Sequence, residues 1–152
     1  HTRISIERSL NRLNTDYLDI VLIHSDGNDE DILNHSGCVG VLKEFQQQGK
    51  IRAIGMSTKT NVGGMLAASM LDIVMITYNL EQQDGAVLDY CRDNGKGVLV
   101  KKGLMSGHAG SVQKSLKLLY SSDGISSVIV GTINPEHLAE NTRLAIELTK
   151  SS

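Results

Sequence analysis

The residues whose side chains are best suited to catalysis or ligand binding stand at the ends of five short apolar runs. The runs are LDIVLIH, IRAIGMST, LDIVMITYN, GVLVKKG and SSVIVGT, and each becomes polar towards its C-terminal end. A strand must become polar wherever it leaves the core, so one such ending means little. Five of them at corresponding positions favour one shared ligand site. The residues at these ends are His24, Ser57-Thr58, Tyr78-Asn79, Lys101-Lys102 and Gly131-Thr132.

Several kinds of site are not supported by the sequence. It has no G-x-G-x-x-G or P-loop pattern for phosphate and no G-x-S-x-G pattern for a hydrolase nucleophile. The paired glycines of NVGGMLA (61–67) have neither phosphate-binding spacing, and we interpret this segment as a loop-to-helix turn. The five histidines show no metal-ligand spacing, so we expect no metal.

The apolar runs have the length and β-branched composition of strands. Their nearly continuous apolar character is typical of parallel strands that are buried on both faces. Gly49 and Gly95 each precede a Lys and a strand, as C-terminal helix caps do, and Asn134 precedes Pro135 as an N-cap. We therefore predict helices over 2–13, 33–48, 62–70, 86–93, 112–120 and 135–150.

This order predicts an α/β fold with a parallel sheet, because parallel strands need crossover helices. An open doubly wound sheet would be complete at this length, whereas a (β/α)8 barrel needs eight units and about 250 residues. The chain opens in the amphipathic segment TRISIERSLNRL with no strand before it, which suggests the middle of a larger pattern. Pro135 is the only proline, so we expect residues 1–152 to form a single domain.

Composition limits the partners and the location. The net charge of −2, from 15 basic and 17 acidic residues, argues against nucleic acid. No window of about 18 apolar residues suggests a membrane span, and the chain does not open with a secretion signal. Cys38 and Cys91 are far apart and do not suggest a disulfide framework, so we expect a cytoplasmic protein.

The segment SLNRLNTDYLDIVLIHS (9–25) resembles the aldo-keto reductases, which carry a very similar run before a strand that ends in His. GKIRAIGMST (49–58), ITYNL (76–80) and SSVIVGTINPEHLAENTRLA (126–145) are similar to later strands and to the last helix, in the family's order. The resemblance implies a (β/α)8 TIM barrel. These five strands would be its fourth to eighth, in a partial, truncated barrel that lacks about three units.

The family's activity would be the NAD(P)H-dependent reduction of aldehydes or ketones. Its tetrad of Asp, Tyr, Lys and His works at the carbonyl, where Tyr donates a proton and His orients and polarises the oxygen. Only His24 matches this tetrad, since Tyr17 and Tyr78 do not fit the tyrosine's motif. The other members are expected in an N-terminal part absent from this chain, which alone should be inactive.

The resemblance also implies contacts with the nicotinamide end of the cofactor. Ser57 matches the serine that binds the carboxamide, Thr58 replaces the following Asn, and Met75 stands in place of a carboxamide-binding Gln. Lys101 and Lys102 replace a stacking aromatic and a Ser. Their ammonium groups would either meet the pyrophosphate or extend into solvent.

Further contacts are implied at the adenosine end. His137 stands where NADPH-preferring members commonly have Arg, which binds a phosphate bidentately as His cannot. We therefore expect NADPH or NADH, with a relaxed preference or a tilt towards NADH. The loop around the adenosine phosphate would be Gly131, Thr132, Ile133 and Asn134, and the adenine edge would be bound by Glu140 and Asn141.

Three functional interpretations stay open. The parent protein could reduce a small carbonyl substrate, or it could be a non-catalytic regulatory subunit like the family's potassium-channel β subunits. Alternatively the 152 residues could be the whole product, a partial barrel whose open sheet edges are covered in a homo-oligomer. The segment HSDGNDEDILNHSG (24–37) would cover part of the substrate pocket as a solvated acidic loop, and it does not identify the substrate.

Overall fold

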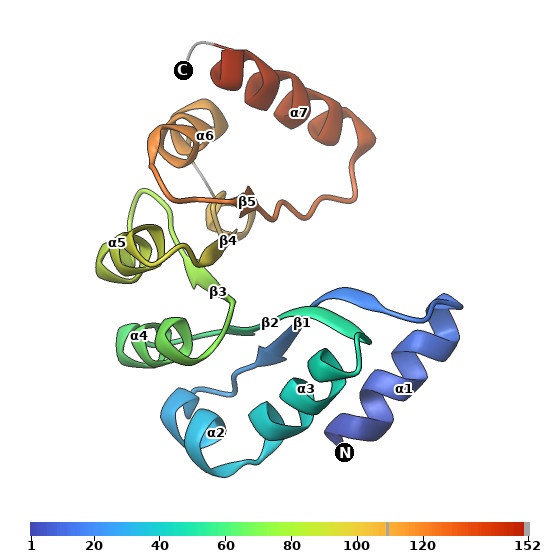
Figure 1. The fold of residues 1–152 in the computed structure, drawn as a ribbon. Helices are drawn as coiled ribbons and strands as arrows, with labels where there is room; N and C mark the ends of the chain where they lie inside the picture. Colours follow the sequence, from blue (N-terminus) through green and yellow to red (C-terminus); the bar gives the residue numbers. More distant parts are fainter. Residues whose placement is uncertain (109, 151–152) are drawn as a thin grey trace. The chain divides into compact units, whose positions relative to one another are not determined.

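The computed structural model describes residues 1–108 and 110–150 and divides the chain into two compact units. The first unit is His1–Met75, drawn from blue to green in Figure 1, and the second is Ile76–Ser152, drawn from yellow to red. The expectation of a single domain stays a prediction.

Strands and helices alternate along both units, as the α/β prediction requires. The helices predicted over 2–13 and 135–150 have those bounds. The elements in order are α1 (Thr2–Leu13), β1 (Leu18–His24), α2 (Asp29–His35), α3 (Cys38–Gln47), β2 (Ile51–Ser57), α4 (Asn61–Met70), β3 (Ile73–Thr77), α5 (Gly85–Asp93), β4 (Gly97–Lys101), η1 (Met105–Gly107), α6 (Val112–Ser121), β5 (Ser127–Val128) and α7 (Pro135–Lys150).

Three parallel strands meet in the first unit. β1 pairs with β2 from Leu18 opposite Ile51 to His24 opposite Ser57. β2 pairs with β3 through Gly55, Met56 and Ser57. Helix α3 packs on β2, and α1 packs in turn on α3. The prediction of parallel strands is confirmed for these pairs.

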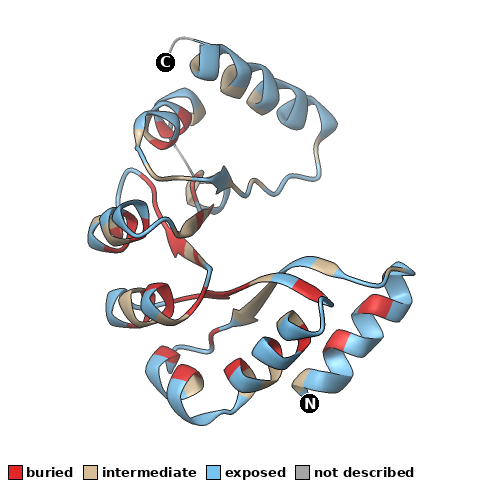
Figure 2. Cartoon of the chain, viewed as in Figure 1, coloured by how far each residue is buried: buried red, intermediate tan, exposed pale blue. Residues whose placement is uncertain are grey.

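The strands of this unit are covered to different degrees, and β1 is the least covered. Ile54, Met56 and Val74 lie on the helix-facing side of β2 and β3 and are at most 1% exposed. They alternate along the strands with Ser57 and Met75, which face the other side. No residue of β1 is buried, and Ile20 on its other face is 45% exposed. Figure 2 shows this contrast, with β2 mostly red and β1 tan or pale blue. The expectation that every strand is buried on both faces is therefore wrong for β1, which among the described residues pairs with β2 alone.

The helix predicted over 33–48 is two helices. Gly37 has φ +71°, a left-handed conformation that glycine adopts without strain, and it separates α2 from α3. The Ser36 hydroxyl donates to the carbonyl oxygen of Ile32 (2.6 Å) and accepts from the Cys38 amide (3.2 Å), which closes one helix and opens the next. The helix predicted over 62–70 begins one residue earlier, at Asn61, so the NVGGMLA segment, interpreted as a loop-to-helix turn, lies within α4.

The second unit pairs β4 and β5 in parallel, with Leu99 opposite Ser127 and Val100 opposite Val128. The strand predicted over 126–132 is much shorter in the structure, because regular pairing with β4 covers only Ser127–Val128. Helix α5 contacts β4, and α6 packs against α7.

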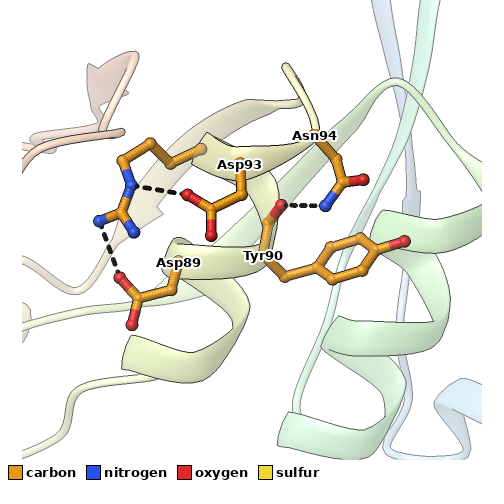
Figure 3. Close-up of polar contacts among 5 residues, drawn as sticks. Asp89, Tyr90, Asp93 and Asn94 are labelled. Carbon is orange, nitrogen blue, oxygen red and sulfur yellow. Dashed lines mark hydrogen bonds and ion pairs between the residues drawn. The ribbon is translucent and has the colours of Figure 1, made fainter.

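The predicted helix caps are confirmed. Gly49 and Gly95 have φ of +73° and +63°, and Asn134 Oδ1 accepts a hydrogen bond from the Glu136 amide at 2.9 Å. Before Gly95, the side chain of Asn94 donates to the carbonyl oxygen of Tyr90 (2.9 Å), as Figure 3 shows.

The same turn of α5 carries an exposed ion-pair cluster. Arg92 contacts Asp93 at 3.0 Å and Asp89 at 2.9 Å, and these partners raise the pKa of the guanidinium (Figure 3). Exposed pairs of this kind contribute little free energy to folding.

Gly55 of β2 has no room for a side chain. A Cβ atom there would overlap the carbonyl oxygen of Ile73 and lie 2.8 Å from Leu22 Cδ2. We predict that Gly55→Ala lowers the free energy of unfolding by roughly 1–3 kcal/mol in urea titrations, because the core would be overpacked. The control is Gly40→Ala in α3, where the Cβ meets nothing within 4 Å. It should be stabilising by roughly 0.5–1 kcal/mol, and equal effects of the two changes would contradict the packing argument.

Candidate functional site

The ends of the three strands in the first unit bring predicted site residues into one row. His24 lies opposite Ser57, and Ser57 lies opposite Met75. Register partners in a parallel sheet present their side chains to the same face. The row is therefore His24, Ser57 and Met75, with an exposed imidazole beside a hydroxyl-bearing residue that is only 5% exposed.

The backbone of this row is held by hydrogen bonds between strand ends. The Ser25 amide donates to the carbonyl oxygen of Ser57 (3.3 Å), and the Thr58 amide donates to that of Met75 (3.1 Å). Thr58 itself is 3% exposed. Main-chain pairing thus continues one residue past each strand and fixes where Ser57 and Thr58 stand.

The acidic segment after His24 is not the solvated loop that the sequence suggested. Residues Asp29–His35 form α2, and Asp29 is 2% exposed. Its Oδ2 atom accepts hydrogen bonds from the amides of Lys59 (2.9 Å) and Thr60 (2.8 Å) and from the Thr60 hydroxyl (2.8 Å). No local sequence signal marks this contact, because it joins residues about 30 positions apart.

These hydrogen bonds set the ionisation of Asp29. Burial alone would raise the pKa of its carboxyl group. The hydroxyls of Ser25 and Thr60 and the two backbone amides together outweigh burial and lower the pKa below its ordinary value. The carboxylate is therefore the form that fits this position.

In the second unit, a hollow of about 260 Å³ lies beside β5 and α7. Two of the predicted adenosine-end residues do not line this hollow. Ile133 is fully exposed, and the side-chain oxygen of Asn134 accepts the hydrogen bond that caps α7. Five others line it with Leu104, Gly107, Val112 and Val130: Gly131, Thr132, His137, Glu140 and Asn141.

The two lysines after β4 differ in exposure. Lys101 ends the strand half-buried, and Lys102 is exposed with φ +55°. The carbonyl oxygen of Lys102 accepts a hydrogen bond from Asn79 Nδ2 (3.1 Å). Asn79, 6% exposed, also accepts from the amides of Glu81 and Gln82 at 2.9 Å each. The sequence marked Asn79 as a strand end but not as the residue that fixes the lysine turn.

Asp84 lies near Lys101 and is 9% exposed. Burial raises the pKa of its carboxyl group, and hydrogen bonds from Gln82 and the Thr77 backbone, with the charge of Lys101, offset this only in part. The ionised form of Asp84 is thus less stable in the folded chain than in the unfolded one.

Within residues 1–108 and 110–150, no group of three or more His, Cys, Asp or Glu side chains could hold a metal ion. In the same residues, no helix is both long enough and apolar enough to cross a membrane.

The raised pKa of Asp84 makes the free energy of unfolding depend on pH in a definite direction. Its contribution to stability is complete below pH 3.8, the unfolded value, and is lost as pH rises through the folded pKa. We predict that Asp84→Asn raises the free energy of unfolding at pH 7, and that this gain disappears below pH 3.8 in urea titrations. The exposed control Asp123→Asn should change it by less than about 0.5 kcal/mol. A loss of stability in Asp84→Asn at pH 7 would contradict the burial argument.

A family model described as Aldo/keto reductase family matches residues 1–115. The chain is 33% identical over 113 residues to the NADH-specific methylglyoxal reductase of Escherichia coli K12, covering 69% of this chain and 35% of the relative. It is also 33% identical over 93 residues to the aldo-keto reductase YhdN of Bacillus subtilis, covering 59% of this chain and 27% of the relative.

Solved structures agree with these matches. A protein of Pseudomonas aeruginosa described as an aldo-keto reductase superimposes with a TM-score of 0.92 at 46% identity, covering 97% of this chain and 58% of that one. An aldo-keto reductase of Bacillus halodurans, 19% identical with a TM-score of 0.78, covers 98% of this chain and 64% of that one and shows the fold alone.

The chain therefore spans about a third of its curated relatives and 58% of the Pseudomonas protein. Its fold is that of part of a (β/α)8 barrel, as the sequence predicted. Since the family model covers well over half of the residues, the chain belongs to the aldo/keto reductase family.

Proposed function

We propose that this chain is the later part of an NAD(P)H-dependent reductase of aldehydes or ketones, in which His24 orients the substrate carbonyl. The observation that carries the proposal is the register that places His24 beside Ser57 at the ends of adjacent parallel strands. In parallel α/β folds this edge is where ligands bind. Membership of the family supplies the reaction class.

His24 suits the task of holding a carbonyl oxygen. Its backbone is fixed by β1, while its ring is exposed at the strand end. A ring N–H there can donate a hydrogen bond to the oxygen and stabilise the negative charge that grows on it during reduction. When bound, the cofactor supplies the hydride that reaches the carbonyl carbon.

Ser57 and Thr58 suit the nicotinamide carboxamide. Both carry hydroxyl groups at the end of β2, and both are at most 5% exposed. A hydroxyl can donate to the carboxamide oxygen or accept from its NH₂ group. Met75, in register with Ser57, offers only a weak thioether acceptor, so we assign it no carboxamide bond.

The hollow beside α7 suits the adenosine end. Gly131, Thr132 and His137 form one part of its lining, and Glu140 and Asn141 form the part that could bind the adenine edge. The N-terminus of α7 adds a favourable environment for phosphate. We extend the same proposal to Ile133 and Asn134, which flank this helix end. Lys102, the more exposed of the two lysines, is the better candidate for the pyrophosphate.

The proposal is tested by cofactor binding to the 152-residue chain. We predict that NADH fluorescence titrations detect binding and that Ser57→Ala weakens it up to about tenfold, because one hydrogen bond to a buried hydroxyl is lost. Ser69→Ala, at an exposed position of α4, should leave the affinity unchanged.

The same chain should show no NADH-dependent reduction of methylglyoxal, the substrate named in the Escherichia coli relative. The family's proton-donating Tyr matches no residue in it. Failure to bind NADH would contradict the proposal. Turnover within about tenfold of the kcat values common for enzymes, roughly 1–1000 per second, would contradict the predicted inactivity of this chain.

The presence of His rather than Arg at position 137 supports a preference for NADH, because Arg would bind a 2′-phosphate bidentately and His cannot. The name of the NADH-specific relative points the same way. We predict that His137→Arg strengthens NADPH binding about tenfold in the same titration and leaves NADH binding unchanged. The control is His35→Arg, an exposed histidine of α2. A preference of the unchanged chain for NADPH of about a hundredfold, or 2.7 kcal/mol, would contradict this.

A non-catalytic regulatory subunit is the alternative, and the two are distinguished by whether the parent protein contains the proton-donating Tyr. The cytoplasmic location and the homo-oligomer stay predictions.

A further inference from the structure

The most buried carboxylate of the first unit lies outside the set of residues assigned to the cofactor. Asp29 begins α2, and the three hydrogen bonds that its Oδ2 atom accepts all come from the loop between β2 and α4. Such charge-assisted hydrogen bonds are shorter and about twice as strong as neutral ones. Asp29 therefore clamps the segment that directly follows Ser57 and Thr58.

The clamp continues into α4. The Thr60 hydroxyl donates to Asp29 Oδ2 (2.8 Å) and accepts from the Gly63 amide (3.0 Å), so the N-cap of α4 is itself fixed by the carboxylate. A Cβ atom at Gly63 would overlap the Asp29 side chain. A helical glycine costs roughly 0.5–1 kcal/mol relative to alanine, and here it makes room for the carboxylate.

The loop is thus held from two sides. On one side, the Thr58 amide donates to Met75 in β3. On the other side, the amides of Lys59 and Thr60 donate to Asp29. The four residues from Ser57 to Thr60 consequently have little freedom to move.

The second carboxylate oxygen of Asp29, Oδ1, accepts none of these three hydrogen bonds. Oδ1 is buried and has no hydrogen-bond partner of good geometry among the described residues. An unsatisfied buried oxygen is unfavourable. The hydrogen bonds at Oδ2, together with the Ser25 hydroxyl, offset this cost, since they hold the pKa of the carboxyl group below its ordinary value.

We propose that Asp29 is a positioning residue for NAD(P)H, which holds the end of β2 so that Ser57 and Thr58 meet the nicotinamide carboxamide. Asp29 does not itself touch the cofactor. This proposal rests on the function proposed above, and it adds a residue that acts through the backbone of the loop.

The test compares Asp29→Ala and Asp29→Asn with the control Asp31→Asn. Asp31 lies on the same helix, but its side chain is 76% exposed and pairs with His35 at the surface. Three quantities are measured on each full 152-residue chain: the NADH dissociation constant by fluorescence, amide hydrogen exchange over residues 57–64, and the thermal unfolding midpoint.

We expect Asp29→Ala to speed exchange at the Lys59, Thr60 and Gly63 amides by about tenfold or more and to raise the NADH dissociation constant about tenfold. Asp29→Asn keeps an acceptor oxygen and should show smaller changes in both, even if the alanine variant does not fold. Asp31→Asn should change neither quantity. Exchange in the β1–β2 ladder should be unaffected in Asp29→Asn, which separates loop opening from general loss of stability.

Each other result overturns the proposal in a recognisable way. Unchanged exchange in both Asp29 variants would show that the carboxylate does not hold the loop. Faster exchange with unchanged NADH affinity would leave a purely structural role and exclude positioning. Failure of the unchanged chain to bind NADH would reject the proposed function and this inference together.

Discussion

The parallel register of β1 and β2 is the constraint on which the candidate site depends. Side chains alternate between the two faces of a strand, so a slip of one residue would turn His24 towards the helices and away from the side of Ser57. The register is specified by apolar residues such as Ile54 and Met56, which must face the helices to be buried. Burial on one face thus decides which polar groups stand together at the strand ends.

Strand register places the ends of the strands, but it does not hold the loops that follow. In each unit a buried polar side chain performs this second task. Asp29 bonds the backbone after β2, and Asn79 bonds its own loop and the carbonyl oxygen of Lys102 after β4. Buried polar groups are favourable when their hydrogen bonds are made, and such networks are rigid. The residues proposed to meet the cofactor therefore extend from a preorganised backbone.

The sequence was informative wherever the signal was local. Helix ends at Gly49, Gly95 and Asn134 could be predicted, because caps depend on residues within one turn. The family assignment came from motifs such as the run before His24, not from periodicity. The break at Gly37 was missed although Ser-Gly is a local signal, because the apolar pattern continues across it.

What the sequence did not reveal depends on distant contacts. Asp29 looked like one more residue of an acidic surface loop, and only the fold brings it to Lys59 and Thr60. The exposure of β1 was unexpected for the same reason, since burial depends on what covers a strand and not on its own composition. Apolar character showed that Ile20 belongs to a strand, but not that it would be 45% exposed.

The central claim is that His24, Ser57 and Thr58 form the nicotinamide end of a cofactor site. Residue-resolved NMR of the isotopically labelled chain, titrated with NADH, tests it most directly. The account predicts saturable shifts of the His24 ring and of the Ser57 and Thr58 amides. Shifts confined to other surfaces, or none at saturating NADH, would contradict it.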